Sequence, residues 1–145
     1  MDPLASLLHA TLYWVSPNER PTIHAVAACR GVVASAELFA MGLGFRSRHQ
    51  LARLLDGEGL PPLRELAAWT RLVNWLLAWD QAGTSLCRMA VETSADPAVC
   101  YRSVKRLTGL PWSTVRARGV PWVLIQLRGR CRIMSRSSGQ ERCAS

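Results

Sequence analysis

The chain has no acidic side chain between Pro97 and Gln140. Residues 1–96 carry 8 arginines against 9 aspartates and glutamates, a net charge of −1, whereas residues 97–145 carry 10 lysines and arginines against Glu141 alone, a net charge of +9. A surface that serves only solubility mixes charges of both signs. The one-sign block therefore predicts a polyanionic partner, either a nucleic acid or, as the alternative, an anionic membrane surface.

Long apolar runs are also absent. The longest cover residues 4–15 and 120–127, both shorter than the roughly 18 residues that span a bilayer. The start, Met1-Asp-Pro, lacks the basic residues of a secretory signal. We therefore expect a cytoplasmic protein with no membrane partner.

The sequence has little that points to metal binding or catalysis. None of the five cysteines lie at C-x-x-C spacing, and the three histidines are scattered. A zinc site needs three or four converging ligands, so we expect reduced thiols and no metal. Carboxylates occur singly, and neither a dinucleotide fingerprint nor a phosphate loop is present. We expect no catalytic residues, no cofactor and no enzymatic activity.

The sequence does contain one pattern of residues that occurs twice. Each copy reads as a short apolar helix, a tight break, a second helix with arginines, and a Gly-Leu-Pro exit. The first copy runs over residues 36–61 and the second over residues 85–111. This pattern indicates two helix-turn-helix units.

A long helix is predicted between the two copies. Over residues 63–81 apolar side chains recur at three- and four-residue steps without Gly or Pro. Trp75 and Trp79 extend its apolar surface to a second face. Other helices are expected over residues 4–15 and, capped by Thr22, from residue 23 to about residue 30.

Four further helix starts carry residues that cap helices. Ser35 and Ser47 are predicted N-caps in the first copy, as are Thr84 or Ser85 and Asp96 in the second. Residues 112–118 read as a short closing helix. Residues 120–127 are compatible with a strand or a helix, and residues 128–145 with a mobile basic tail.

These segments predict an all-α protein with two helix-turn-helix lobes joined by a long linker helix. Its parts are an N-terminal helix and Pro-containing linker (1–21), a first lobe (22–62), the linker helix (63–82), a second lobe (83–119), and an apolar segment with the basic tail (120–145). Helical periodicity places one set of side chains in the core: Leu51, Leu55, Trp69, Leu76, Met89, Val104 and Leu107. It leaves another set exposed: Arg48, Gln50, Arg102 and Lys105.

Residues 23–119 resemble the AraC-type family of bacterial transcription regulators. The first copy is similar to a family pattern at Ser47, Leu51, Arg53, Leu55, Glu58 and Gly59. The second is similar at Asp96, Tyr101-Arg102, Val104-Lys-Arg106, Thr108-Gly109, Pro111 and Arg116. The resemblance implies sequence-specific binding of duplex DNA to regulate transcription.

The chain also departs from the family pattern in the second copy. Ser94 and Ala95 replace a Gly-aromatic turn, and Cys100 and Val104 replace aromatic core residues. Pro97 and the adjacent alanine stand where the family offers polar base-reading groups. The second unit is therefore expected to hold phosphates more than to read bases.

Candidate DNA contacts divide into two groups. The candidates for base reading are Arg46, Arg48, His49 and Gln50, since arginine pairs with guanine and glutamine with adenine in the major groove. The candidates for phosphate contact are Ser47, Arg53, Arg102, Lys105, Arg106 and Arg116. The alternative for each group is an ordinary solvated face.

At the level of the whole protein, two other hypotheses remain open. One is a protein-interaction module that keeps the fold without reading DNA; the other is a basic domain that binds nucleic acid or membrane surfaces without sequence preference. RNA polymerase or another regulator is a candidate protein partner, and a small-molecule effector is not evident.

Overall fold

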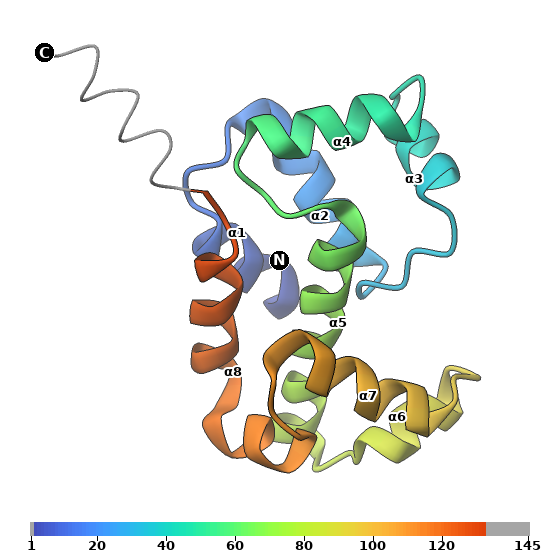
Figure 1. The fold of residues 1–145 in the computed structure, drawn as a ribbon, viewed down its shortest axis with the longest axis vertical. Helices are drawn as coiled ribbons and strands as arrows, with labels where there is room; N and C mark the ends of the chain where they lie inside the picture. Colours follow the sequence, from blue (N-terminus) through green and yellow to red (C-terminus); the bar gives the residue numbers. More distant parts are fainter. Residues whose placement is uncertain (1, 133–145) are drawn as a thin grey trace, which may run out of the picture.

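The computed structural model describes residues 2–132, and within them the chain forms helices and no strand, which confirms an all-α fold (Figure 1). A single 3-10 turn, η1 (Pro17–Glu19), precedes the second helix. The helices are α1 (Pro3–Thr11), α2 (Arg20–Ala28), α3 (Ala36–Gly42), α4 (Arg48–Gly57), α5 (Leu63–Ala82), α6 (Leu86–Glu92), α7 (Pro97–Thr108) and α8 (Trp112–Gly129).

The 20-residue helix α5 is the centre of the molecule. It contacts α1, α2, α6, α7 and α8, and stands upright in Figure 1 with α4 at its upper end and α7 at its lower end. Trp69, Leu72 and Leu76 are almost fully buried on it. Each such side chain contributes about 1.5–3 kcal/mol to folding. The helix predicted over residues 63–81 is therefore confirmed, and it extends to Ala82.

Two short helix pairs, α3–α4 and α6–α7, flank α5. Each of these four helices begins at a side chain that accepts a hydrogen bond from a free backbone N–H of the first turn. Ser35 Oγ and Ser47 Oγ accept at 3.2 and 3.3 Å, and Ser85 Oγ and Asp96 Oδ1 at 3.1 and 3.0 Å. Such caps are worth about 1 kcal/mol each. The predicted helix starts are confirmed.

The start of α2 differs from the prediction. The helix begins at Arg20, and Thr22 lies inside it, 3% exposed, so Thr22 is not its N-cap. Pro21 occupies the first turn of α2, where a backbone N–H has no helical partner and proline is tolerated.

Helix α8 consists of two segments joined at Gly119. The φ and ψ of Gly119, 85° and 177°, lie in a region open essentially to glycine alone. Residues 112–118 form the predicted closing helix. Residues 120–127 are helical because Pro121 fits a first turn and the apolar stripe of Val120, Val123 and Leu127 is buried against α5 and α1.

The prediction that a mobile tail begins at residue 128 is wrong for residues 128–132. Arg130 forms an ion pair with Glu65 (Nη2–Oε1 2.8 Å). The backbone N–H of Arg132 donates to the carbonyl of Gly59 at 2.8 Å. Polar contacts with the α4–α5 region thus hold this segment. Residues 133–145 of the predicted tail lie outside the described residues.

The N-terminal segment packs onto the same region. Leu4, Leu8 and Leu12 are fully buried, and α1 contacts α2, α5 and α8. The indole N–H of Trp14 donates to the carbonyl of Glu58 at 2.8 Å. The segment that follows α1 and the C-terminal end of the described chain therefore both meet the turn that follows α4.

Most of the expected burial pattern is confirmed. Six of the seven predicted core residues are buried: Leu51, Leu55, Trp69, Leu76, Met89 and Val104. Leu107 is half-buried because the last turn of α7 lies at the edge of the core. Arg48, Arg102 and Lys105 are exposed as expected, whereas Gln50 is half-buried. Between residues 2 and 132, no helix combines the length and apolarity that crossing a bilayer requires.

Gly31 allows α5 to approach the chain that follows α2. Its φ is +75°, and a Cβ atom there would lie 2.3 Å from the carbonyl oxygen of Ala67 and 2.6 Å from the backbone nitrogen of Arg71. We expect Gly31→Ala to lower the free energy of unfolding by about 3 kcal/mol, through strain and overpacking. Urea denaturation measures this change.

The matched control is Gly83→Ala. Gly83 also has a positive φ, +64°, but a Cβ atom there would meet nothing within 4 Å. The free energy of unfolding of this variant should fall by only about 1 kcal/mol, the cost of placing alanine in the left-handed conformation. Equal losses in the two variants would contradict the proposed contact between Gly31 and α5.

His9, at the α1–α2 contact, makes stability depend on pH. Its ring lies 6.4 Å from that of His24, and Arg20 Nη1 donates to the His9 carbonyl at 2.9 Å. Burial, then the charges of Arg20 and His24, lower the pKa of His9 below its ordinary 6.5. The folded state therefore favours the neutral ring, and this contribution is present above pH 6.5 and lost as pH falls below it.

We expect the free energy of unfolding to decrease from pH 7.5 to pH 5, and His9→Gln to reduce that decrease because glutamine does not titrate. Urea denaturation at both pH values tests this. His49→Gln, on the exposed side of α4, is the control. The same pH dependence in His9→Gln and wild type would show that another group is responsible.

Candidate nucleic-acid interface

Helix α4 presents most of the predicted base-reading residues to solvent. Leu51 and Leu55, each 1% exposed, fix the inner side of the helix. Arg46, Arg48 and His49 are exposed, at or just before its first turn. Arg53, a predicted phosphate contact, is also exposed, one turn further along. The amphipathic sequence of α4 thus sets these cations outward.

Gln50 is engaged in the capping of α4. Its Oε1 accepts a hydrogen bond from the backbone N–H of Arg46 at 2.7 Å, while its own backbone N–H donates to Ser47 Oγ at 3.3 Å. The two bonds resemble a capping box, except that the Gln50 side chain bonds the residue before the N-cap. The prediction that Gln50 is an exposed base reader is therefore wrong on exposure. The periodicity of α4 gave no sign of this second role.

Ser47 combines two possible roles. Its hydroxyl oxygen accepts from Gln50, and a serine hydroxyl retains one hydrogen that it can donate. Ser47 is half-buried at the start of α4. This placement is compatible with the predicted phosphate contact at the N-terminus of the helix.

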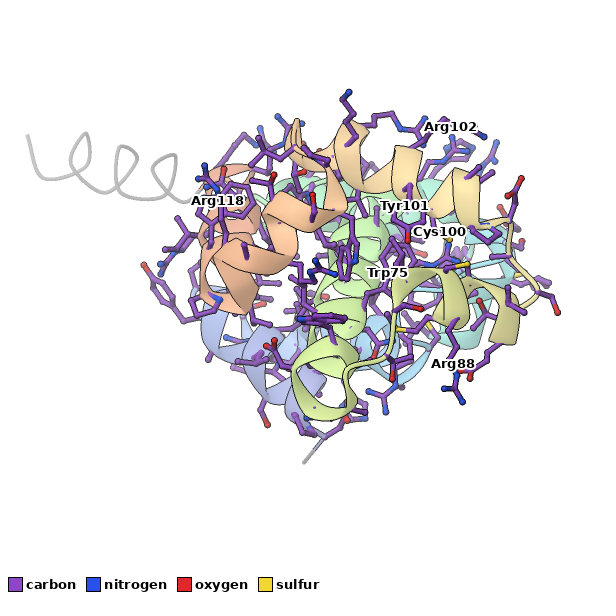
Figure 2. All side chains as sticks on the ribbon, turned by 90° about the horizontal axis from the view of Figure 1, so that it is seen from below. Trp75, Arg88, Cys100, Tyr101, Arg102 and Arg118 are labelled. Carbon is purple, nitrogen blue, oxygen red and sulfur yellow. The ribbon has the colours of Figure 1, made fainter. Side chains whose placement is uncertain are left out.

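Helix α7 carries the predicted basic face. Cys100 and Val104 are buried, and Arg102, Lys105 and Arg106 occupy exposed positions. In Figure 2 the Arg102 side chain projects outward from α7, whereas Arg88 of α6 projects from the other side of the helix pair. The Arg102 side chain thus lies away from that of Arg88 on α6.

Arg116 lies apart from α4 and α7. Its guanidinium carbon is 4.3 Å from the centroid of the Trp79 ring, and the residue is half-buried at the contact of α5 with α8. A cation–π pair of this kind contributes about 0.5–1 kcal/mol. In the structure, Arg116 therefore has a packing role beside the phosphate contact predicted for it.

The distribution of ion pairs separates the candidates from the other arginines. Four ion pairs occur among residues 2–132, and their cations are Arg30, Arg88, Arg130 and Arg132. No predicted DNA-contacting cation takes part in any of them. The cations on the outer sides of α4 and α7 therefore form no ion pair within residues 2–132, although the Glu37 carboxylate accepts the backbone N–H of Arg48 at 3.4 Å.

Sequence reasoning missed Arg64 and Arg71 on α5. Both line a groove between α5 and α7, with Ser103 opposite them. They are seven residues apart, which places them on one side of a helix. That spacing was visible in the sequence, but the apolar stripe of α5 gave no reason to assign them a function.

The thiols and metal-binding side chains show no sign of a reactive centre. Burial raises the pKa of Cys131 to about 12, with the Glu65 charge adding to the effect, and burial also raises the pKa of Cys100. Such thiols stay protonated at neutral pH. Within the described residues, no group of three or more His, Cys, Asp and Glu side chains is placed to hold a metal ion.

Comparisons of the chain with protein-family models, curated proteins and solved structures find no match.

The capping role of Gln50 can be separated from any contact with DNA. We expect Gln50→Ala to lower the free energy of unfolding by about 1 kcal/mol, since it loses the bond to the Arg46 N–H. Gln50→Glu keeps an acceptor oxygen and should stay close to wild type. Urea denaturation of the three proteins tests this, and equal stability of all three would contradict a capping role.

Proposed function

We propose that the protein binds duplex DNA with sequence preference and regulates transcription in the bacterial cytoplasm. In this proposal α3–α4 and α6–α7 act as two helix-turn-helix units, similar to those of the AraC-type family, and α5 is the helix that joins them. The observation that carries the proposal is that the basic side chains on α4 and α7 have no carboxylate partners among residues 2–132, although four other arginines do.

The arrangement of the helices supports two contacts with one duplex. In Figure 1, α4 and α7 both run across the page at opposite ends of α5. Recognition helices that enter successive major grooves of one DNA face are about 34–36 Å apart. A single helix between the two units, buried on several sides, would hold such a spacing without a flexible linker.

The two units are proposed to contribute differently. Arg46, Arg48 and His49 at the start of α4 have the donors that read base edges. The start of α7 exposes Ala98 and Val99 instead, and its cations follow in the next turns. The first unit would therefore supply most of the base reading, and the second most of the phosphate contacts.

One observation favours a second candidate function. On α3, Leu38 is 71% exposed and Met41 is 55% exposed, and the two lie on one side of the helix. Exposed apolar side chains at helical spacing are a common feature of protein interfaces. A module that binds RNA polymerase or another regulator through α3 would use this surface, with or without DNA.

The division of roles predicts two kinds of variant. Arg48→Ala should weaken binding to a selected duplex by about 1–3 kcal/mol while changing binding to random duplexes less, because a base contact is lost. Arg102→Ala, Lys105→Ala and Arg106→Ala should weaken both duplexes similarly and reduce the salt slope by about one each. Titration by fluorescence anisotropy at several salt concentrations measures both effects.

Arg88→Ala is the control, since Arg88 is exposed but paired with Glu92 on α6 (Nε–Oε1 3.1 Å). It should leave affinity and salt slope unchanged. If Arg48→Ala affects selected and random duplexes equally, Arg48 does not read bases. If neither group of variants changes DNA binding, the interaction module replaces this proposal.

A further inference from the structure

The surface between α5 and α7 is hollowed into two adjoining grooves. One, of about 420 Å³, is lined by Arg64, Arg71 and Ser103 together with residues of the 31–36 segment. The other, of about 700 Å³, shares Arg64 and Ser103 and continues to Arg106. Because they share walls, they form one depression, here named the central groove.

The central groove carries unneutralised positive charge. Arg64 and Arg106 are exposed and Arg71 is half-buried, and none has a carboxylate partner within the described chain. The one acidic side chain in its lining, Glu65, is paired with Arg130 at 2.8 Å. The remaining charge favours an anionic ligand.

The shape of the groove suits an extended anion. Small side chains in the lining leave room for a ligand between the cations: Ala34, Ala36, Ala68 and Ser103. A sugar-phosphate strand is such a ligand, with one charge for each residue of the strand.

The side chain of Arg71 is held in place by Trp75. Its guanidinium carbon lies 5.0 Å from the centroid of the Trp75 ring. Stacking uses the flat face of the guanidinium, and its N–H donors point outward in the plane. Arg71 is therefore oriented before binding, with its donors available to phosphate oxygens.

We propose that the central groove binds the phosphates that border the DNA minor groove midway between the two helix-turn-helix units. This inference rests on the function proposed above. When α4 and α7 enter successive major grooves, the minor groove between them faces α5. Arg64 and Arg71 lie about 10 Å apart along α5, so that each can contact one of the two strands bordering a minor groove about 6 Å wide.

The test compares salt dependence of binding in the full chain. Arg64→Gln and Arg71→Gln should each reduce the slope of log affinity against log salt by about one. The fold loss of affinity between 50 and 200 mM salt should thereby be about fourfold smaller in each variant than in the wild type. The ratio of affinities for selected and random duplexes should stay unchanged, because phosphates carry no sequence information.

Arg118→Gln is a matched control for Arg71→Gln. The Arg118 guanidinium carbon lies 5.0 Å from the Trp122 ring centroid, the same stacking distance, but the residue belongs to α8 and lies outside the central groove (Figure 2). This variant should keep the wild-type slope. A reduced slope here, equal to that of Arg71→Gln, would overturn the assignment to the groove.

A second experiment replaces the phosphates instead of the arginines. Neutral methylphosphonates at the central minor-groove positions of the selected duplex should lower wild-type affinity, but have little further effect on the Arg64→Gln, Arg71→Gln double variant. Arg64 is exposed, so Arg64→Gln carries the test if Arg71→Gln loses its fold. Thermal unfolding of each variant shows whether it is folded.

The outcomes separate this inference from the proposed function. If the groove variants keep the wild-type slope while Arg102→Gln lowers it, the central groove does not contact DNA although α7 does. If Arg102→Gln also leaves DNA binding unchanged, the proposed function fails, and the central-groove inference fails with it.

Discussion

The burial of α5 on several sides is the constraint on which the rest of the structure depends. A helix that contacts α1, α2, α6, α7 and α8 cannot turn about its axis without opening several interfaces. The free-energy cost of ordering α5 is offset at all of these interfaces, and the α6–α7 pair packs directly against it. Helices as short as α3 and α6, of seven residues each, would not be stable alone.

Several polar contacts of the described chain gather around the α4–α5 region. Glu58 accepts the Ser16 hydroxyl at 2.6 Å, and the Arg132 backbone bonds to the next residue, Gly59. Glu65 holds Arg130. Glu58 and Glu65 thus tie the segment after α1 and the C-terminal end of the described chain to the α4–α5 region, while the cations of α4 and α7 form no ion pair among residues 2–132.

The sequence predicted the positions of the helices better than the contacts that their side chains make. Helix starts at Ser35, Ser47 and Asp96 could be read directly, because a cap and its first turn are local in the chain. The helical state of residues 120–127 could not, since it depends on burial against α1 and α5. Gln50 shows the same limit within the candidate site: periodicity placed it outward, but its hydrogen bond to Arg46 depends on the path of the chain before α4.

Arg64 and Arg71 could not be predicted as binding residues from the sequence, for a related reason. The predicted binding residues lie on helices that resemble recognition helices, and the apolar stripe of α5 is accounted for by its place in the core. Only the packing of α7 against α5 turns two isolated arginines into one wall of a groove, and only the placement of Trp75 orients one of them. The charge that a partner would meet thus depends on how the helices pack against one another. A helix that forms the core can also expose cations in a groove beside its neighbours.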